Sequence, residues 1–142
     1  MTRIVPDNSV VLAWCLADEN HPRAERAMQL VIEHGAVVPG IWWYELRNAL
    51  MVNERRGRLS AADSRSTLAD LREMRITIDH EHDEALLLDL SRQRELSVYD
   101  ASYLEVALRG ALRLASLDRR LCEAASVCDI ALLEEGQELG GA

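Results

Sequence analysis

The sequence contains no lysine: all 16 of its basic residues are arginines. A P-loop needs a lysine on its phosphates and a Schiff-base enzyme needs one as its nucleophile, so both mechanisms are excluded. Phenylalanine is also absent, and no apolar run approaches the roughly 20 residues that span a bilayer. The three cysteines form no C-x-x-C pair, which indicates reduced thiols. With no signal peptide visible, we expect a cytoplasmic protein without membrane association.

Acidic residues outnumber basic ones by 24 to 16, which gives a formal net charge of −8 at pH 7. This balance argues against binding of nucleic acid or anionic lipid through bulk positive charge, but it allows a local acidic site for metal cations. Hydrophobic residues make up 49% of the 142 residues, enough for one packed core. We expect a single domain over residues 1–133 and a loose, glycine-containing tail over residues 134–142.

Short apolar segments alternate with longer segments of helical periodicity. This alternation predicts right-handed crossovers and a parallel sheet of about five strands with helices on both faces. In such sheets, ligands bind beyond the carboxyl ends of the strands, where the strand order reverses. The expected strands are 4–5, 36–38, 76–78, 113–115 and 130–132, and the expected helices are 10–16, 22–33, 41–56, 60–74, 83–94, 101–108 and 119–125.

Four carboxylates stand close to the carboxyl ends of predicted strands or to helix starts. Asp7 and Asp118 follow strands, whereas Glu45 and Asp100 lie near the starts of helices. Taken one at a time, the three aspartates are better explained as simple N-caps, in which a carboxylate accepts from free helix amides. Glu45 borders an apolar stripe, where an unpaired charge is costly. If the four converge without histidine or cysteine, their oxygens select a hard cation such as Mg²⁺ or Mn²⁺.

Four segments of the chain resemble the PIN-domain family, in the order and spacing of that family and over nearly the whole sequence. The similarity is strongest to the VapC-type toxins of bacterial toxin–antitoxin systems. The matching segments are VPDNSVVLAW at 5–14, PGIWWYELRNAL at 39–50, VYDASY at 98–103 with Ala107, and LASLDRRL at 114–121. The resemblance implies a Rossmann-like three-layer α/β/α sandwich and a metal-dependent endoribonuclease. It also implies RNA as substrate, a VapB-like antitoxin as partner and a homodimer.

The resemblance also implies roles for single residues. The family's acidic metal-binding positions, which hold one or two Mg²⁺ or Mn²⁺ ions, correspond to Asp7, Glu45, Asp100 and Asp118. Ser116 stands where the family has Thr or Ser, and Ser9 matches a small polar position after the first aspartate; both hydroxyls are expected to support the site.

Other features have simpler interpretations, and one alternative function stays open. Exposed Arg47, Arg55 and Arg119 are candidates for phosphate contacts, because a guanidinium offers phosphate a fork of donors. The acidic, histidine-containing segment 79–84 is interpreted as a solvated helix start, and 42–43, a tryptophan pair, as core. Receiver domains and haloacid-dehalogenase-like phosphatases need a lysine that this chain lacks. The alternative function is a PIN-like domain that serves as a non-catalytic interaction or RNA-binding scaffold.

Overall fold

A four-stranded parallel sheet forms the centre of the molecule in the computed structural model, which describes residues 3–16 and 20–134. The strand order is β3-β2-β1-β4, and every pair is parallel. The strands are β1 (Ile4–Pro6), β2 (Ala36–Pro39), β3 (Ile76–Asp79) and β4 (Arg113–Ala115). The helices of the described residues are α1 (Asn8–Cys15), α2 (Pro22–His34), α3 (Ile41–Arg55), α4 (Ala61–Glu73), α5 (Glu84–Arg94), α6 (Val98–Gly110) and α7 (Arg119–Val127).

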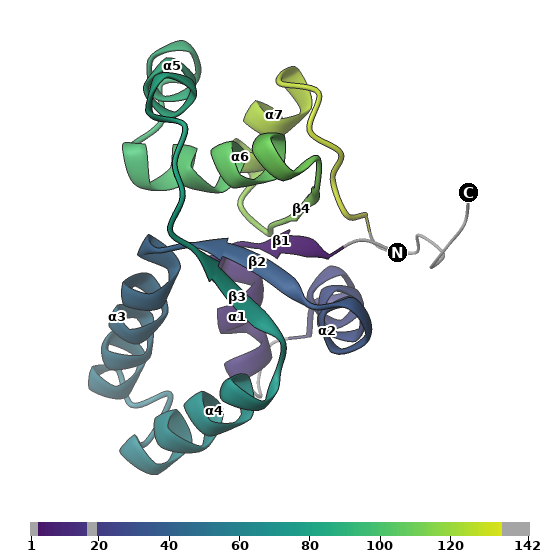
Figure 1. Ribbon diagram of the computed structural model, residues 1–142. Coiled ribbons are helices and arrows are strands. Elements are labelled where there is room, and N and C mark those ends of the chain that lie inside the picture. Colours follow the sequence, from purple (N-terminus) through teal and green to yellow (C-terminus); the bar gives the residue numbers. More distant parts are fainter. Residues whose placement is uncertain (1–2, 17–19, 135–142) are drawn as a thin grey trace.

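Helices cover both faces of the sheet, which confirms the predicted α/β/α sandwich. In the view of Figure 1, α5, α6 and α7 lie above the sheet, and α1 to α4 lie below it. The chain runs from β1 outward through β2 to β3 and then crosses back to place β4 on the other side of β1. The strand order therefore reverses at β1, and Pro6 and Ala115 pair at the carboxyl ends of β1 and β4. Ligand sites of open sheets form at such a reversal.

The predicted fifth strand is wrong as a strand. Within the described residues, segment 130–132 makes only an isolated parallel bridge, between Leu132 and Leu114. Backbone hydrogen bonds from Leu114 to Ala131 and from Leu133 to Leu114 flank this bridge, but the pairing extends no further. Asp129 just before it adopts a left-handed backbone with φ of 60°, which turns the chain sharply after α7. The predicted tail lies outside the described residues from position 135 onward.

Side-chain caps account for most helix starts in the described residues. Ser60 and Asp63 form a capping box at the start of α4, and Gly35 with φ of 90° ends α2. Helix α6 begins three residues earlier than predicted, at Val98, because the Ser97 side chain accepts a hydrogen bond from the amide of Asp100. Gly110 is the last residue of α6, and Ala111 makes the turn after it with φ of 52°.

Aliphatic side chains, Tyr103 and Trp42 fill the interior of this phenylalanine-free chain. The largest fully buried side chains include Tyr103, Ile4, Leu30, Leu46 and Leu104. Each such side chain contributes on the order of 1.5–3 kcal/mol when removed from water. No helix in the described part of the chain is long and apolar enough to cross a membrane. The three cysteines are free, as expected, and each is half-buried.

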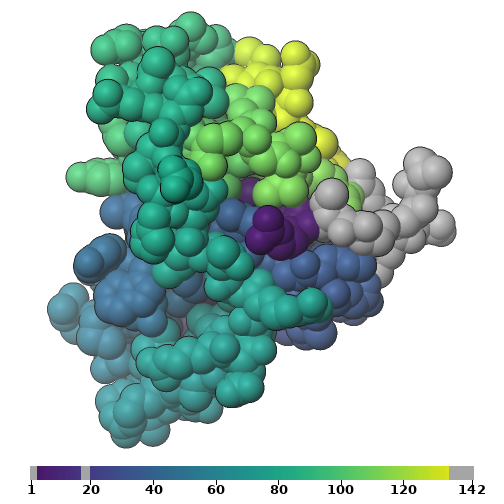
Figure 2. Space-filling model, viewed as in Figure 1, coloured from purple at the N-terminus to yellow at the C-terminus, as the bar shows by residue number. Residues whose placement is uncertain are grey.

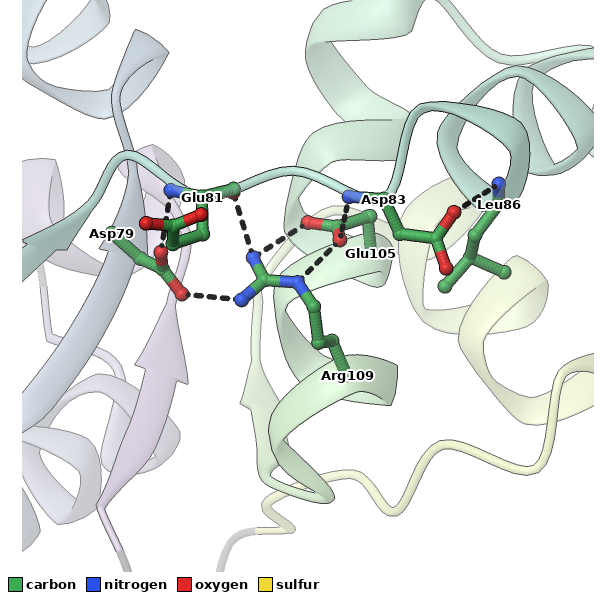
Figure 3. A network of polar contacts seen from close by, with 6 residues as sticks. All are labelled: Asp79, Glu81, Asp83, Leu86, Glu105 and Arg109. Atoms are coloured by element: carbon green, nitrogen blue, oxygen red, sulfur yellow. Dashed lines mark hydrogen bonds and ion pairs between the residues drawn. The ribbon is translucent and has the colours of Figure 1, made fainter.

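An arginine on α6 fixes the segment between β3 and α5, which crosses the front of the molecule in the space-filling view (Figure 2). Arg109 binds both carboxylate oxygens of Glu105, at 2.6 and 2.9 Å, and one oxygen of Asp79 at 2.9 Å. Glu105, only 2% exposed, also accepts from the Asp83 amide at 3.1 Å (Figure 3). The solvated interpretation of segment 79–84 is therefore wrong for Asp79, which Arg109 holds in an ion pair.

Candidate active site

The four predicted carboxylates line one pocket at the carboxyl ends of β1 and β4. The pocket has a volume of about 300 Å³. Asp7 comes from the β1–α1 junction, Glu45 from α3, Asp100 from the first turn of α6 and Asp118 from the start of α7. The other lining residues are Asn8, Ser9, Leu12, Tyr103 and Leu121. Residues up to 111 positions apart in sequence thus meet at the point where the strand order reverses.

Asp7 is the most deeply placed of the four, with 5% of its surface exposed. Its Oδ1 accepts hydrogen bonds from the Ser9 hydroxyl at 2.6 Å and from the Val10 amide at 3.2 Å. Its Oδ2 accepts from the Ser116 hydroxyl at 2.5 Å. The bond from Val10 makes Asp7 the N-cap of α1, so this aspartate both caps a helix and lines the pocket.

The hydroxyls of Ser9 and Ser116 connect the β1–α1 loop to the β4–α7 loop. Each serine donates its proton to Asp7 and accepts from a backbone amide of the β4–α7 loop at 2.9 Å: Ser9 from Leu117, across the two loops, and Ser116 from Asp118, within its own loop. Ser116 is 1% exposed, and its carbonyl accepts from Arg23 of α2 at 2.9 Å. Asp7 is therefore held in one orientation by groups from both sides of the strand reversal.

Glu45 receives its hydrogen bond from a residue to which sequence analysis assigned no role. The hydroxyl of buried Tyr103 donates to Oε1 of Glu45 at 2.6 Å. Tyr103 lies three positions after Asp100 on α6, a spacing that places two side chains on the same helix face. That spacing could have placed Tyr103 beside Asp100 in the site, but it does not identify Glu45 as the acceptor of its hydrogen bond.

Asp100 and Asp118 complete the wall. Asp118 is the N-cap of α7, and its Oδ1 accepts from the amides of Arg120 and Leu121 at 2.9 and 3.2 Å. Asp100 is not an N-cap, because Ser97 fills that position in α6. No side chain or amide of the described residues donates to the Asp100 carboxylate.

Burial and mutual repulsion raise the pKa values of three of the carboxyls. Burial is the largest cause for Asp7, Glu45 and Asp100. The hydrogen bonds from Ser116, Ser9 and the Val10 amide oppose the rise in the pKa of Asp7, while the charge of Asp118 adds to it. Asp100 and Asp7 both add to the rise in the pKa of Glu45. Negative charge in this pocket is therefore unfavourable in the absence of a cation.

The donor set of the pocket fits a hard cation. The side-chain atoms of the pocket wall that can bind a cation are all oxygens. One of them, Oδ1 of Asn8, is buried and has no hydrogen-bond donor among the described residues. Within residues 3–16 and 20–134, no three carboxylate, imidazole or thiol groups are arranged to hold a metal ion together. Mg²⁺ does not need such a cage, because it keeps several of its waters and binds through one or two carboxylates.

The predicted arginines lie apart from the pocket wall. Arg47 stacks on the ring of Trp43, with its guanidinium carbon 3.7 Å from the ring centroid, and lines a different cavity. Arg55 is exposed in the last turn of α3, and Arg119, next to Asp118, is exposed at the start of α7. Trp43 itself is 41% exposed, so the core interpretation of the tryptophan pair is right for Trp42 and wrong for Trp43.

Comparison with known proteins gives consistent matches. The sequence profile of the PIN domain matches residues 4–127. Ribonuclease VapC3 of Pyrobaculum aerophilum is 30% identical over 124 residues, which cover 85% of this chain and 93% of that protein. The crystal structure of PAE2754 from the same organism superposes with a TM-score of 0.67 at 26% identity, over 87% of this chain and 84% of that one. The structure of Mycobacterium tuberculosis VapC20, a toxin that cleaves the sarcin–ricin loop, gives a TM-score of 0.60 at 17% identity, over 85% and 94% of the two chains, and thus shares the fold.

Proposed function

This chain belongs to the PIN-domain family, and from that premise we propose that it is a VapC-type toxin, an endoribonuclease that hydrolyses RNA phosphodiester bonds with Mg²⁺ or Mn²⁺. The observation that carries the proposal is the convergence of Asp7, Glu45, Asp100 and Asp118 on one pocket at the strand reversal. The 30% identity to Ribonuclease VapC3 over most of both chains supports RNA as the substrate.

Asp7 and Asp100 are the residues that we expect to bind one or two cations directly, and Glu45 and Asp118 bind directly or through water. A bound divalent cation lowers the pKa of a water molecule and stabilises the charge of the phosphodiester transition state. The chain's own contribution is orientation: hydrogen bonds from Ser9 and Ser116 orient the Asp7 carboxylate, and one from Tyr103 orients that of Glu45. Preorganised oxygens of this kind need no rearrangement during the reaction.

The similarity to Ribonuclease VapC3 also supports a proposal about partners. We propose a VapB-like antitoxin that blocks the acidic pocket, and a homodimer as the form that it binds. A basic side chain of the antitoxin is electrostatically matched to a pocket whose carboxyls have raised pKa values, since a cation relieves their mutual repulsion. Inhibition of RNA cleavage by the product of a neighbouring gene tests this part of the proposal.

The central test is the substitution Asp7→Asn in an RNA cleavage assay. We expect the wild-type chain to cleave members of a panel of structured RNAs with Mg²⁺ or Mn²⁺ and to lose this activity in EDTA. Asp7→Asn should abolish cleavage while the far-ultraviolet circular dichroism spectrum stays unchanged. The matched control is Asp129→Asn, which removes the same charge far from the pocket, at a left-handed position that Asn also adopts readily.

Two results contradict the proposal. An Asp7→Asn variant that cleaves RNA as the wild type does removes the acidic pocket from the mechanism. A wild-type chain that binds RNA, or an antitoxin, without cleaving any RNA in either metal favours the scaffold function instead.

A further inference from the structure

A second cavity, of about 190 Å³, lies at the free edge of the sheet between α3, α4 and β3. It shares no lining residue with the carboxylate pocket, so it is independent of the proposed ribonuclease function. Its floor is apolar and includes Leu46, Leu68 and Leu71. An apolar cavity of about 150 Å³ is known to accept benzene, so this one has room for one leucine-sized or aromatic side chain.

The polar groups of this cavity are donors only. Arg47, Arg72 and two tryptophans contribute N–H groups, and none of the lining side chains carries a carboxylate, an amide carbonyl or a hydroxyl. Arg72 makes no hydrogen bond or ion pair with any residue in the described ranges, and the indole N–H of buried Trp42 has no acceptor there. In a chain of net charge −8, this local surplus of positive charge is complementary to an anionic group.

The backbone beside the cavity is an unpaired strand edge. β3 is the last strand of the sheet, and within the described residues only β2 pairs with it. The Ala36 amide donates to the carbonyl of Arg75, so Arg75 and Thr77 turn their backbone groups toward β2. The backbone groups of Ile76 and Ile78 therefore point to the free edge. The Ile76 amide donates to the carbonyl of Met74, whereas the N–H and C=O of Ile78 point away from the sheet. The strand lies at the front of both molecular views (Figures 1 and 2).

We propose that β3 accepts an extended segment of a partner protein as an added strand, which places one apolar side chain in this cavity and a carboxylate two residues away on Arg47 and Arg72. Alternate residues of a strand share a face, and the cavity lies on the face to which Ile76 and Ile78 contribute. Strand addition obtains affinity from main-chain hydrogen bonds and specificity from pockets for alternate side chains. The recognised pattern is therefore an apolar residue, any residue, and then Asp or Glu.

Two other occupants fit these observations less well. A second copy of the chain in a two-fold contact centred here sets the arginines of one copy against those of the other, which is repulsive. A nucleic-acid phosphate satisfies the arginines, but it makes no use of the apolar floor or of the outward N–H and C=O groups of Ile78.

The test uses the full chain labelled with ¹⁵N and three blocked nonapeptides. The first places Leu and Glu two residues apart within a Ser/Thr-rich sequence; the second has Gln in place of Glu, and the third has Ala in place of Leu. We expect the Leu/Glu peptide to bind about tenfold more tightly than either analogue, because a charge-assisted hydrogen bond and a buried side chain each supply a factor of that order. The Ile78 amide should shift and become protected from hydrogen exchange when this peptide binds.

Two matched variants connect this preference to the cavity. Arg72→Gln should remove the preference for Glu over Gln, whereas Arg65→Gln, an exposed arginine of α4 outside the cavity wall, should retain it. Equal binding of the Glu and Gln peptides to the wild-type chain, or an unchanged Ile78 amide, refutes the proposal. It is equally refuted if these signals respond only to protein concentration, which indicates self-association, or only to an oligonucleotide. RNA cleavage does not enter any of these measurements, so the ribonuclease proposal stands or falls separately.

Discussion

Substituting Ser116→Ala tests how firmly the two loops of the site hold Asp7. The change removes a 2.5 Å hydrogen bond to the Asp7 carboxylate and leaves the Asp118 amide without its acceptor. A hydrogen bond to a charged group contributes about 1.5–3 kcal/mol, and the part-buried Asp118 amide left without its acceptor adds about 1 kcal/mol. We therefore expect the free energy of unfolding to fall by about 2–4 kcal/mol near neutral pH.

The loss should depend on pH with a defined sign. Burial raises the pKa of Asp7, and the hydrogen bond from Ser116 opposes that rise. Removing the hydroxyl raises the pKa of Asp7 further, so the destabilisation is largest where Asp7 is ionised and shrinks as the pH falls through its raised pKa. Urea unfolding in EDTA at pH 8 and at pH 4 measures both values.

Two controls bracket this experiment. Ser116→Thr keeps the hydroxyl and should restore most of the stability, whereas Ser126→Ala, at an exposed position on α7, should change the free energy of unfolding by less than about 0.5 kcal/mol. A loss smaller than about 1 kcal/mol at pH 8, or one that increases toward pH 4, refutes the assignment of this bond as a support of ionised Asp7.

Three further substitutions probe other contacts. Asp100→Asn should stabilise the EDTA-treated protein at pH 7 by about 0.5 kcal/mol. Burial and the charge of Asp118 raise the pKa of Asp100, so the ionised carboxylate destabilises the fold increasingly as the pH rises. In urea unfolding, the gain in the variant should vanish by pH 4. Tyr103→Phe removes the 2.6 Å bond to Glu45 and raises the pKa of Glu45 further, so the acidic limb of the RNA cleavage profile should move to higher pH, and an unmoved limb contradicts this role. Arg109→Met leaves buried Glu105 unpaired and should lower the free energy of unfolding in urea by about 3–5 kcal/mol. The double variant with Glu105→Leu should recover most of this loss. Equal losses in the single and double variants rule out an unpaired charge as the cause.

The fold was predictable where a feature depends on neighbouring residues. The capping box at Ser60 and the glycine at position 35 are local signals, and the predicted helices 60–74 and 22–33 agree with α4 and α2 to within one residue at each end. The extent of strand pairing is not local. The apolar run 130–132 resembles a strand, yet the number of its residues that pair depends on where the chain leaves α7, and the left-handed turn at Asp129 permits one bridge.

The site was predictable to the level of loops but not of contacts. Asp7 and Asp118 follow strands that the periodicity identifies, and parallel strands bring their carboxyl ends to one edge. The hydrogen bond between Tyr103 and Glu45 joins residues 58 positions apart, and no spacing rule specifies such a partner. The same holds for Arg23, which reaches the carbonyl of Ser116 from α2, 93 positions away.

Helix capping alone does not explain the charge at position 7. The cap of α1 needs one acceptor for the Val10 amide, and a serine or asparagine at this position supplies one about as well without a buried charge. Instead, position 7 has a carboxylate that is only 5% exposed, and the charge of Asp118 adds to the rise in its pKa. Its second oxygen accepts a hydrogen bond from Ser116, 109 positions away in the sequence. A buried carboxylate of this kind lowers the stability of the free protein at neutral pH. Such locally unfavourable arrangements are typical of sites that bind a ligand. We therefore propose a divalent cation as this ligand, because its charge would replace the repulsion among these carboxylates with attraction to the ion.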